Sequence, residues 1–90
     1  MEKGQARKIL SELLASHPSS VSFTKHCRVE MENDQLITGD LFNVLRGGKI
    51  HTDAEFENGQ WRYRIQTAKM IVVIAFANPN KVRCVTTWRT

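Results

Sequence analysis

Apolar residues in the first half of the chain recur every three or four positions, which is the spacing of amphipathic helices. Residues 3–16 are expected to form the first helix, which ends at a His-Pro pair because the residue before a proline avoids the α region. Thr24 is expected to cap a second helix that runs to about Asn33. A third helix is expected from Thr38, its N-cap, to Gly47, which would end it in the left-handed conformation.

The pattern changes to a period of two after residue 49, which indicates strands. Asn58-Gly59 predicts a two-residue type I′ hairpin turn, and the polar residues 78–81 predict another turn. The apolar run at 70–76 is typical of a central strand that is covered on both faces. We therefore expect four strands, at residues 50–57, 60–67, 70–76 and 82–89.

Helices followed by strands indicate an α+β protein, with N-terminal helices packed on one face of a four-stranded antiparallel sheet. The 90 residues are enough for one domain. Within it we expect an N-terminal helix at 1–17, two helices at 22–46 and a meander of strands at 49–90.

Strand alternation predicts two different sheet faces. In the second strand Trp61, Tyr63 and Ile65 point one way, and Arg62 and Arg64 point the other way. In the last strand Cys84 and Trp88 are expected on one face, and Arg83 and Arg89 on the other. The face opposite the helices is thus expected to be a basic, concave platform.

The charge distribution points to the same half of the chain. Residues 1–45 carry five basic and six acidic side chains, whereas residues 46–90 carry eight basic and three acidic ones. A basic surface suits a polyanion or an acidic partner. The alternative is an ordinary solvated surface.

Composition excludes several classes of protein. Two cysteines are too few for a disulfide framework, so we expect a reduced, cytoplasmic protein. The longest apolar run, at 70–77, is too short to span a bilayer, and no secretory signal is visible. The cysteines and histidines lack metal-ligand spacing, and Gly47-Gly48 lacks the context of a phosphate loop. We expect no metal, no cofactor and no membrane partner.

Five segments carry a resemblance that covers about two thirds of the chain. They are FTKHCRVEM at 23–31, DLFNVLRGG at 40–48, WRYR at 61–64, IVVIAF at 71–76 and VTTWR at 85–89. The sequence resembles short bacterial domain-of-unknown-function proteins allied to the RelE, MqsR and BrnT toxins of type II toxin–antitoxin modules. The resemblance implies helices followed by a four-stranded sheet, metal-independent cleavage of mRNA, free or on the ribosome, and a cognate antitoxin with zinc-ribbon and helix-turn-helix parts.

Metal-independent RNA cleavage needs a base for the 2′-hydroxyl, a cation for the phosphate and an acid for the leaving oxygen. The candidate catalytic residues are His26, Tyr63, Arg64 and Lys69. The resemblance places Arg62, Arg64 and Arg89 near the active site. Arginine suits phosphate because the parallel N–H donors of its planar guanidinium group, arranged as a fork, match the spacing of two phosphate oxygens. The candidate RNA-binding residues are Arg28, Arg46, Arg62, Arg83 and Arg89.

Each candidate also has a structural interpretation. His26 could be a buried or capping residue, and Tyr63 could pack in the core with its strand neighbours. Arg28 could pair with Glu32 on one helix face. Lys69 could be a solvated turn lysine. The acidic row Asp53, Glu55 and Glu57 is expected to mark an exposed sheet edge.

Two other functions remain open at this point. The same basic face could serve a non-catalytic module that binds RNA or protein. A degenerate toxin could retain the fold without the acid–base pair. In the toxin hypothesis, the antitoxin is expected to cover the basic face or to displace the first helix.

Overall fold

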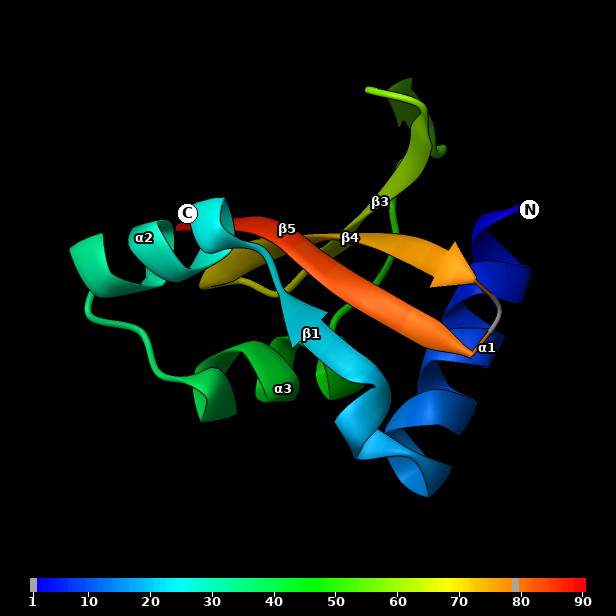
Figure 1. Cartoon of the computed structure of the whole chain (residues 1–90), viewed down its shortest axis with the longest axis horizontal. Coiled ribbons are helices and arrows are strands. Elements are labelled where there is room, and N and C mark those ends of the chain that lie inside the picture. Colours follow the sequence, from blue (N-terminus) through cyan, green and yellow to red (C-terminus); the bar gives the residue numbers. More distant parts are fainter. Residues whose placement is uncertain (1, 79) are drawn as a thin grey trace.

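Three helices pack on a five-stranded mixed sheet in the computed structural model, which describes residues 2–78 and 80–90 (Figure 1). The strand order is β1-β5-β4-β3-β2. The elements are α1 (Lys3–Ser16), the 3₁₀ turn η1 (Pro18–Ser20), β1 (Val21–Phe23), α2 (Lys25–Asn33), α3 (Thr38–Gly47), β2 (Glu55–Glu57), β3 (Gln60–Gln66), β4 (Met70–Asn78) and β5 (Lys81–Arg89). No helix among the described residues is long and apolar enough to cross a bilayer.

The helices lie where the apolar spacing predicts them. Thr24 is the N-cap of α2, as predicted, and its hydroxyl accepts a hydrogen bond from the Cys27 amide at 3.0 Å. The N-cap of α3 is Ile37 and not the predicted Thr38. The cause is Asp40, whose carboxylate accepts a hydrogen bond from the Ile37 amide at 2.9 Å and so satisfies the first turn from inside the helix.

The end of α3 corrects the prediction for Gly47. Gly47 is the last helical residue, and Gly48 is the C-cap with a φ of −77°, so neither glycine adopts the left-handed conformation here. Gly48 is needed for space. A Cβ at this position would lie 2.6 Å from the Val44 carbonyl oxygen and 2.8 Å from Cγ2 of Ile65. The glycine therefore lets the end of the helix approach β3 closely.

The sheet contains one strand more than expected, and it is not purely antiparallel. β2, β3, β4 and β5 form the predicted antiparallel meander. The additional strand β1 pairs in parallel with β5, with Val21 opposite Val82 and Phe23 opposite Cys84. Three residues are too few to show a period of two, and their partners lie some sixty positions away in the chain. The sequence pattern therefore did not predict β1.

The first hairpin forms as predicted, but its first strand is short. Asn58 and Gly59 have φ values of 52° and 78°, as a type I′ turn requires. Only Glu55–Glu57 of the predicted strand 50–57 is in β2, and Lys49 forms an isolated bridge with Gln66. The turn predicted at 78–81 includes Pro79, which lies outside the described residues.

The main core lies between the helices and one face of the sheet. Its members include Leu10 of α1, Cys27 of α2 and Leu41 of α3, packed with Tyr63 of β3 and Val72 of β4. Tyr63 is 2% exposed. Trp61, which was expected to share this core, is 54% exposed because the β2–β3 hairpin extends beyond the helices.

A bulge in β5 reverses the predicted faces of its C-terminal half. Val73 pairs with Thr86 and Ile74 pairs with Cys84, so Val85 is an extra residue in β5. The predicted grouping of Cys84 with Trp88, and of Arg83 with Arg89, is therefore wrong. Cys84 and Arg89 lie on the helix side, whereas Arg83 and Trp88 lie on the opposite face.

Candidate nucleic-acid interface

The sheet face opposite the helices, called the open face below, gathers three arginines and a tryptophan. Cross-strand register brings them together. Arg62 and Arg83 both pair with Ala75, from opposite sides of β4. In the next rows Arg64 and Thr86 both pair with Val73, and Trp88 pairs with Ile71. Arg62, Arg64 and Arg83 therefore occupy neighbouring rows on one face.

The open face is concave. A hollow of about 230 Å³ is lined by residues from β2, β3, β4 and β5: Glu55, Glu57, Arg62, Arg64, Val73, Thr86 and Trp88. β2 and β5 are separated by two strands, so they can line the same hollow only because the sheet curves. Figure 1 shows this curvature, since the β2–β3 end rises out of the plane of the other strands.

Two glutamates on β2 face the arginines of β3 inside this hollow. Arg62 Nη1 lies 3.4 Å from Glu57 Oε2, and Arg64 Nη2 lies 3.5 Å from Glu55 Oε1. Both pairs are single, long contacts and not the bidentate fork that holds an arginine most tightly. Nε of Arg62 is buried and has no hydrogen-bond partner among the described residues. The guanidinium groups thus retain donors for a further acceptor.

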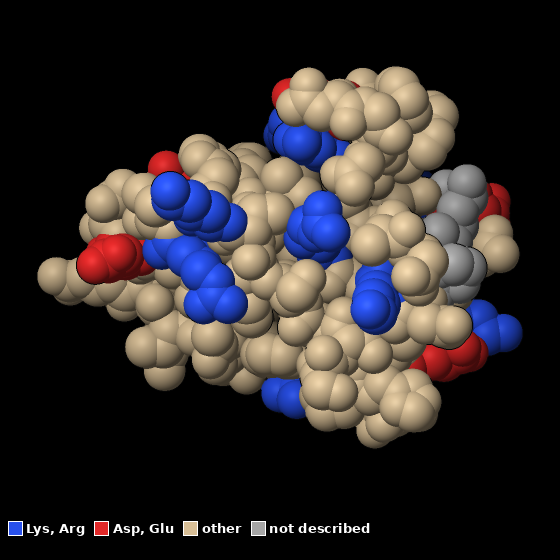
Figure 2. Space-filling model, viewed as in Figure 1, with Lys and Arg blue, Asp and Glu red and all other residues tan. Residues whose placement is uncertain are grey.

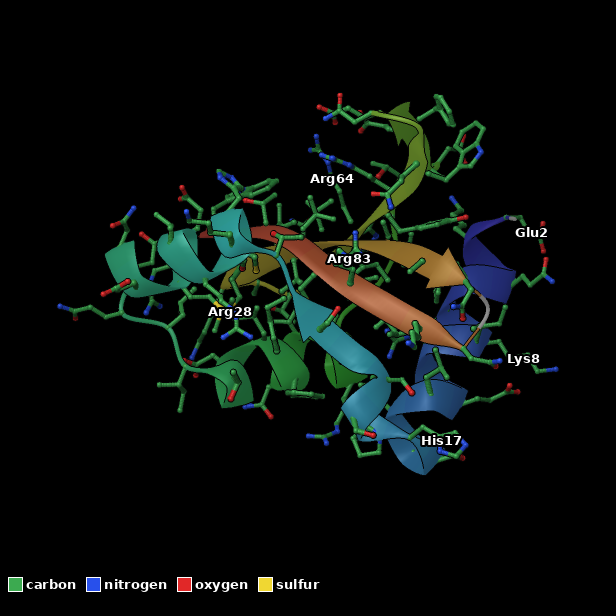
Figure 3. The ribbon with its side chains drawn as sticks, viewed as in Figure 1. Glu2, Lys8, His17, Arg28, Arg64 and Arg83 are labelled. Atoms are coloured by element: carbon green, nitrogen blue, oxygen red, sulfur yellow. The ribbon has the colours of Figure 1, made fainter. Side chains whose placement is uncertain are left out.

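Arg64 also lies over the ring of Trp88, with its guanidinium carbon 5.6 Å from the ring centroid. Arg83 is exposed, and no described carboxylate lies within 4 Å of its guanidinium group. Figure 3 shows Arg64 and Arg83 on the same side of the sheet. The open face therefore offers both paired and free guanidinium groups next to an aromatic ring.

The floor of the open face is apolar and buried. Ile71, Val73, Ala75 and Val85 are buried and form a second small cluster, against which Trp88 packs. Arg62 and Arg64 line the same hollow as Val73, one member of this cluster.

Helix α2 holds two of the other predicted site residues. His26 and Arg28 are exposed there, and the Arg28 guanidinium lies 5.7 Å from the centroid of the Phe23 ring. Figure 2 shows Lys and Arg side chains as separate groups along the side of the molecule that carries α2 and β5, with acidic side chains toward its margins. Neither His26 nor Arg28 lines the hollow.

The remaining predicted residues lie elsewhere. Tyr63 is buried on the opposite side of β3 from Arg62 and Arg64, where its ring packs edge-on against Phe76. Lys69 and Arg89 border a different pocket beside α3, and Arg89 donates two hydrogen bonds to the Asp34 carbonyl, at 3.0 and 3.3 Å. Arg46 is exposed on α3, with its guanidinium over the Phe42 ring. Of the nine predicted residues, the structure brings together Arg62, Arg64 and Arg83.

Glu55 and Glu57 were not among the predicted site residues. The sequence carried a signal for them, because a two-residue turn at Asn58-Gly59 fixes the register of the hairpin. That register places Glu55 opposite Arg62 and Glu57 opposite Gln60. The two carboxylates therefore share a face with the arginines, and they are the acid–base groups that the hollow contains in addition to its guanidiniums.

The described residues offer neither a metal-binding cluster nor an ionised thiol at neutral pH. The described residues contain no group of three His, Cys, Asp or Glu side chains arranged to hold a metal ion. Both cysteines are buried and free. Burial raises the pKa of the Cys27 thiol to about 11 and that of the Cys84 thiol to about 12, so both are protonated at neutral pH.

Comparisons of the chain with protein-family models, with curated proteins and with solved structures find no match.

Proposed function

We propose that the open face binds single-stranded RNA and that the protein is a metal-independent endoribonuclease, the toxin of a type II toxin–antitoxin module with a RelE-like fold. The observation that carries the proposal is the convergence of Arg62, Arg64 and Arg83 with Trp88 on one concave face. Arginine forks bind phosphates, and aromatic rings stack on unpaired bases. The resemblance of the sequence to the toxins supplies the class of reaction.

In this proposal the cleavage chemistry belongs to the Arg62–Glu57 pair. The Glu57 carboxylate takes the proton of the 2′-hydroxyl, and the 2′-oxygen attacks the adjacent phosphorus. The Arg62 guanidinium stabilises the negative charge that develops on the phosphate. The bond from phosphorus to the 5′-oxygen breaks, and the leaving oxygen takes a proton from water. The hydroxide that remains takes the proton that Glu57 gained, which restores the carboxylate. The products are a 2′,3′-cyclic phosphate and a 5′-hydroxyl.

The proposed partners follow from the same face. An antitoxin that covers the open face would block both the arginines and the hollow, and an acidic surface would complement them. We place this activity in the cytoplasm, where both mRNA and reduced cysteines are found.

Growth after induced expression tests the proposal. We expect the wild type to arrest growth and to produce new RNA 5′ ends, and Arg62→Gln/Arg64→Gln to do neither. Lys8→Ala/Lys25→Ala is the matched control, because it removes the same charge from exposed positions outside the hollow. Arg62→Lys/Arg64→Lys keeps the charge but loses the fork, so we expect intermediate activity from it. Equal arrest and equal cleavage by the folded Gln variant would contradict the proposal.

A non-catalytic RNA-binding module is the second candidate. The observation that favours it is that His26, Tyr63 and Lys69 lie away from the hollow. In that case purified protein would bind RNA with an affinity that falls as salt rises, and the RNA would stay intact after long incubation. Cyclic phosphate ends that disappear in Glu57→Gln would instead favour the nuclease.

A further inference from the structure

The hollow on the open face has two halves with different chemistry. Near the hairpin turn, Glu57 pairs with Arg62, the pair to which the cleavage step is assigned. In the other half, Glu55 pairs with Arg64, which lies over the ring of Trp88. A carboxylate, a planar cation and an aromatic ring thus meet in the second half. None of these three groups is needed for the cleavage step itself.

The second half has the features of a nucleobase site. Unpaired bases stack on aromatic rings and on guanidinium planes, and here the guanidinium carbon of Arg64 lies 5.6 Å from the centroid of the Trp88 ring. The Arg64 side chain is 47% exposed, so a further planar group can reach it from solvent. The apolar Val73 forms the floor, and the Thr86 side chain lines the wall. The hollow, with a volume of about 230 Å³, has room for one base.

The carboxylate decides which base this site would take. Glu55 is a pure hydrogen-bond acceptor when ionised, and its side chain is 60% exposed, so it can turn toward a ligand. Only one of its oxygens, Oε1, contacts Arg64. Guanine alone among the four bases presents two adjacent N–H donors, N1–H and the N2 amino group, on its Watson–Crick edge. Uracil presents one donor between two carbonyl oxygens, which a carboxylate repels.

We infer that the Glu55–Arg64–Trp88 half of the hollow binds a guanine base of single-stranded RNA, and that Glu55 selects it through N1–H and the N2 amino group. The inference rests on the proposed RNA-binding function. It assigns Glu55 a role in specificity and leaves the proton transfer to Glu57.

Fluorescence anisotropy of short labelled RNAs tests this inference. The probes are oligoadenylates with one central guanosine, inosine, cytidine or uridine, each with 2′-O-methyl groups so that none is cleaved. Inosine lacks only the N2 amino group. We expect the wild type to bind the guanosine probe about tenfold more tightly than the inosine probe, the effect of one hydrogen bond to a charged group. We expect Glu55→Gln to abolish this ratio.

The readout is the ratio of affinities and not the affinity itself, because removing a negative charge strengthens RNA binding in general. Glu12→Gln is the matched control, since Glu12 is exposed on α1 and does not line the hollow. Its ratio is expected to equal that of the wild type. A ratio abolished by Glu57→Gln but retained by Glu55→Gln would overturn the assignment to Glu55.

The inference and the proposed function fail in different ways. Salt-sensitive binding to all probes with equal affinity would overturn the guanine site and leave the RNA-binding face intact. The absence of binding to every probe at low salt would overturn the proposed function, and the guanine site with it.

Discussion

At the scale of single residues, strand alternation places the polar side chains of β3 in two environments, the open face and the core. Arg62 and Arg64 point to the open face, and Tyr63 between them is 2% exposed in the core. This division follows from the sequence alone. The sequence also indicated core packing as an alternative to catalysis for Tyr63, and the structure places it there. Burial raises the pKa of the Tyr63 phenol, so little of it is present as the phenolate that could act as a general base at neutral pH.

Gly48 is a residue whose role the sequence did not reveal. We expect Gly48→Ala to lower the free energy of unfolding by about 1–3 kcal/mol, because the added Cβ meets the backbone of Val44 and the side chain of Ile65. Gly47→Ala is the matched control. A Cβ at Gly47 has nothing within 4 Å, and alanine is a better helix former, so we expect no loss. Urea denaturation of the two variants measures the difference, and equal stabilities would contradict this account.

The buried thiols predict a pH dependence of stability. Their pKa values, about 11 for Cys27 and about 12 for Cys84, lie above those of exposed thiols, which are near 8.5. Between roughly pH 8.5 and pH 11 the unfolded chain loses these protons and the folded chain keeps them. The free energy of unfolding therefore falls as pH rises through this window. We expect urea denaturation to show a shallower fall in Cys27→Ala/Cys84→Ala; an identical pH slope would rule out the thiols as its source.

At the scale of elements, local patterns predicted three helices and four strands, whereas long-range contacts determined the rest. The strand β1 has only three residues, and its pairing with β5 joins distant parts of the chain. The bulge at Val85 is equally invisible in the pattern of β5, and it moves Trp88 onto the open face and Arg89 off it. The site was therefore predictable along β3, whose alternation is regular, and not along the C-terminal half of β5.

The bulge is tied to the start of α2 through one side chain. The Thr24 hydroxyl caps α2 and donates a hydrogen bond to the Val85 carbonyl at 2.8 Å. We expect Thr24→Ala to cost about 1–2 kcal/mol of stability, since it removes both interactions. Thr24→Ser keeps the hydroxyl and is expected to retain most of the stability. Thermal denaturation compares the two, and a Ser variant as unstable as the Ala variant would show that the hydroxyl is not responsible.

At the scale of the whole molecule, the excess of basic residues in the second half of the chain is divided by the fold. Arg62, Arg64 and Arg83 gather on the open face, whereas Arg89 and Lys69 border a pocket beside α3. Composition thus predicted the amount of positive charge but not its location. The curvature of the sheet, which lets β2 and β5 line one hollow, is also a property of the assembled molecule.

The two tryptophans provide the most direct measurement of the central claim, that RNA binds the open face. Trp88 lines the hollow there, and Trp61 lies on the other side of the sheet, half exposed, packed edge-on against Phe56. Each indole N–H gives its own signal in a ¹⁵N–¹H NMR spectrum. On titration with a short 2′-O-methyl RNA, we expect the Trp88 signal to shift and the Trp61 signal to stay in place. A shift of Trp61 alone, or no shift of either signal at low salt, would contradict the account.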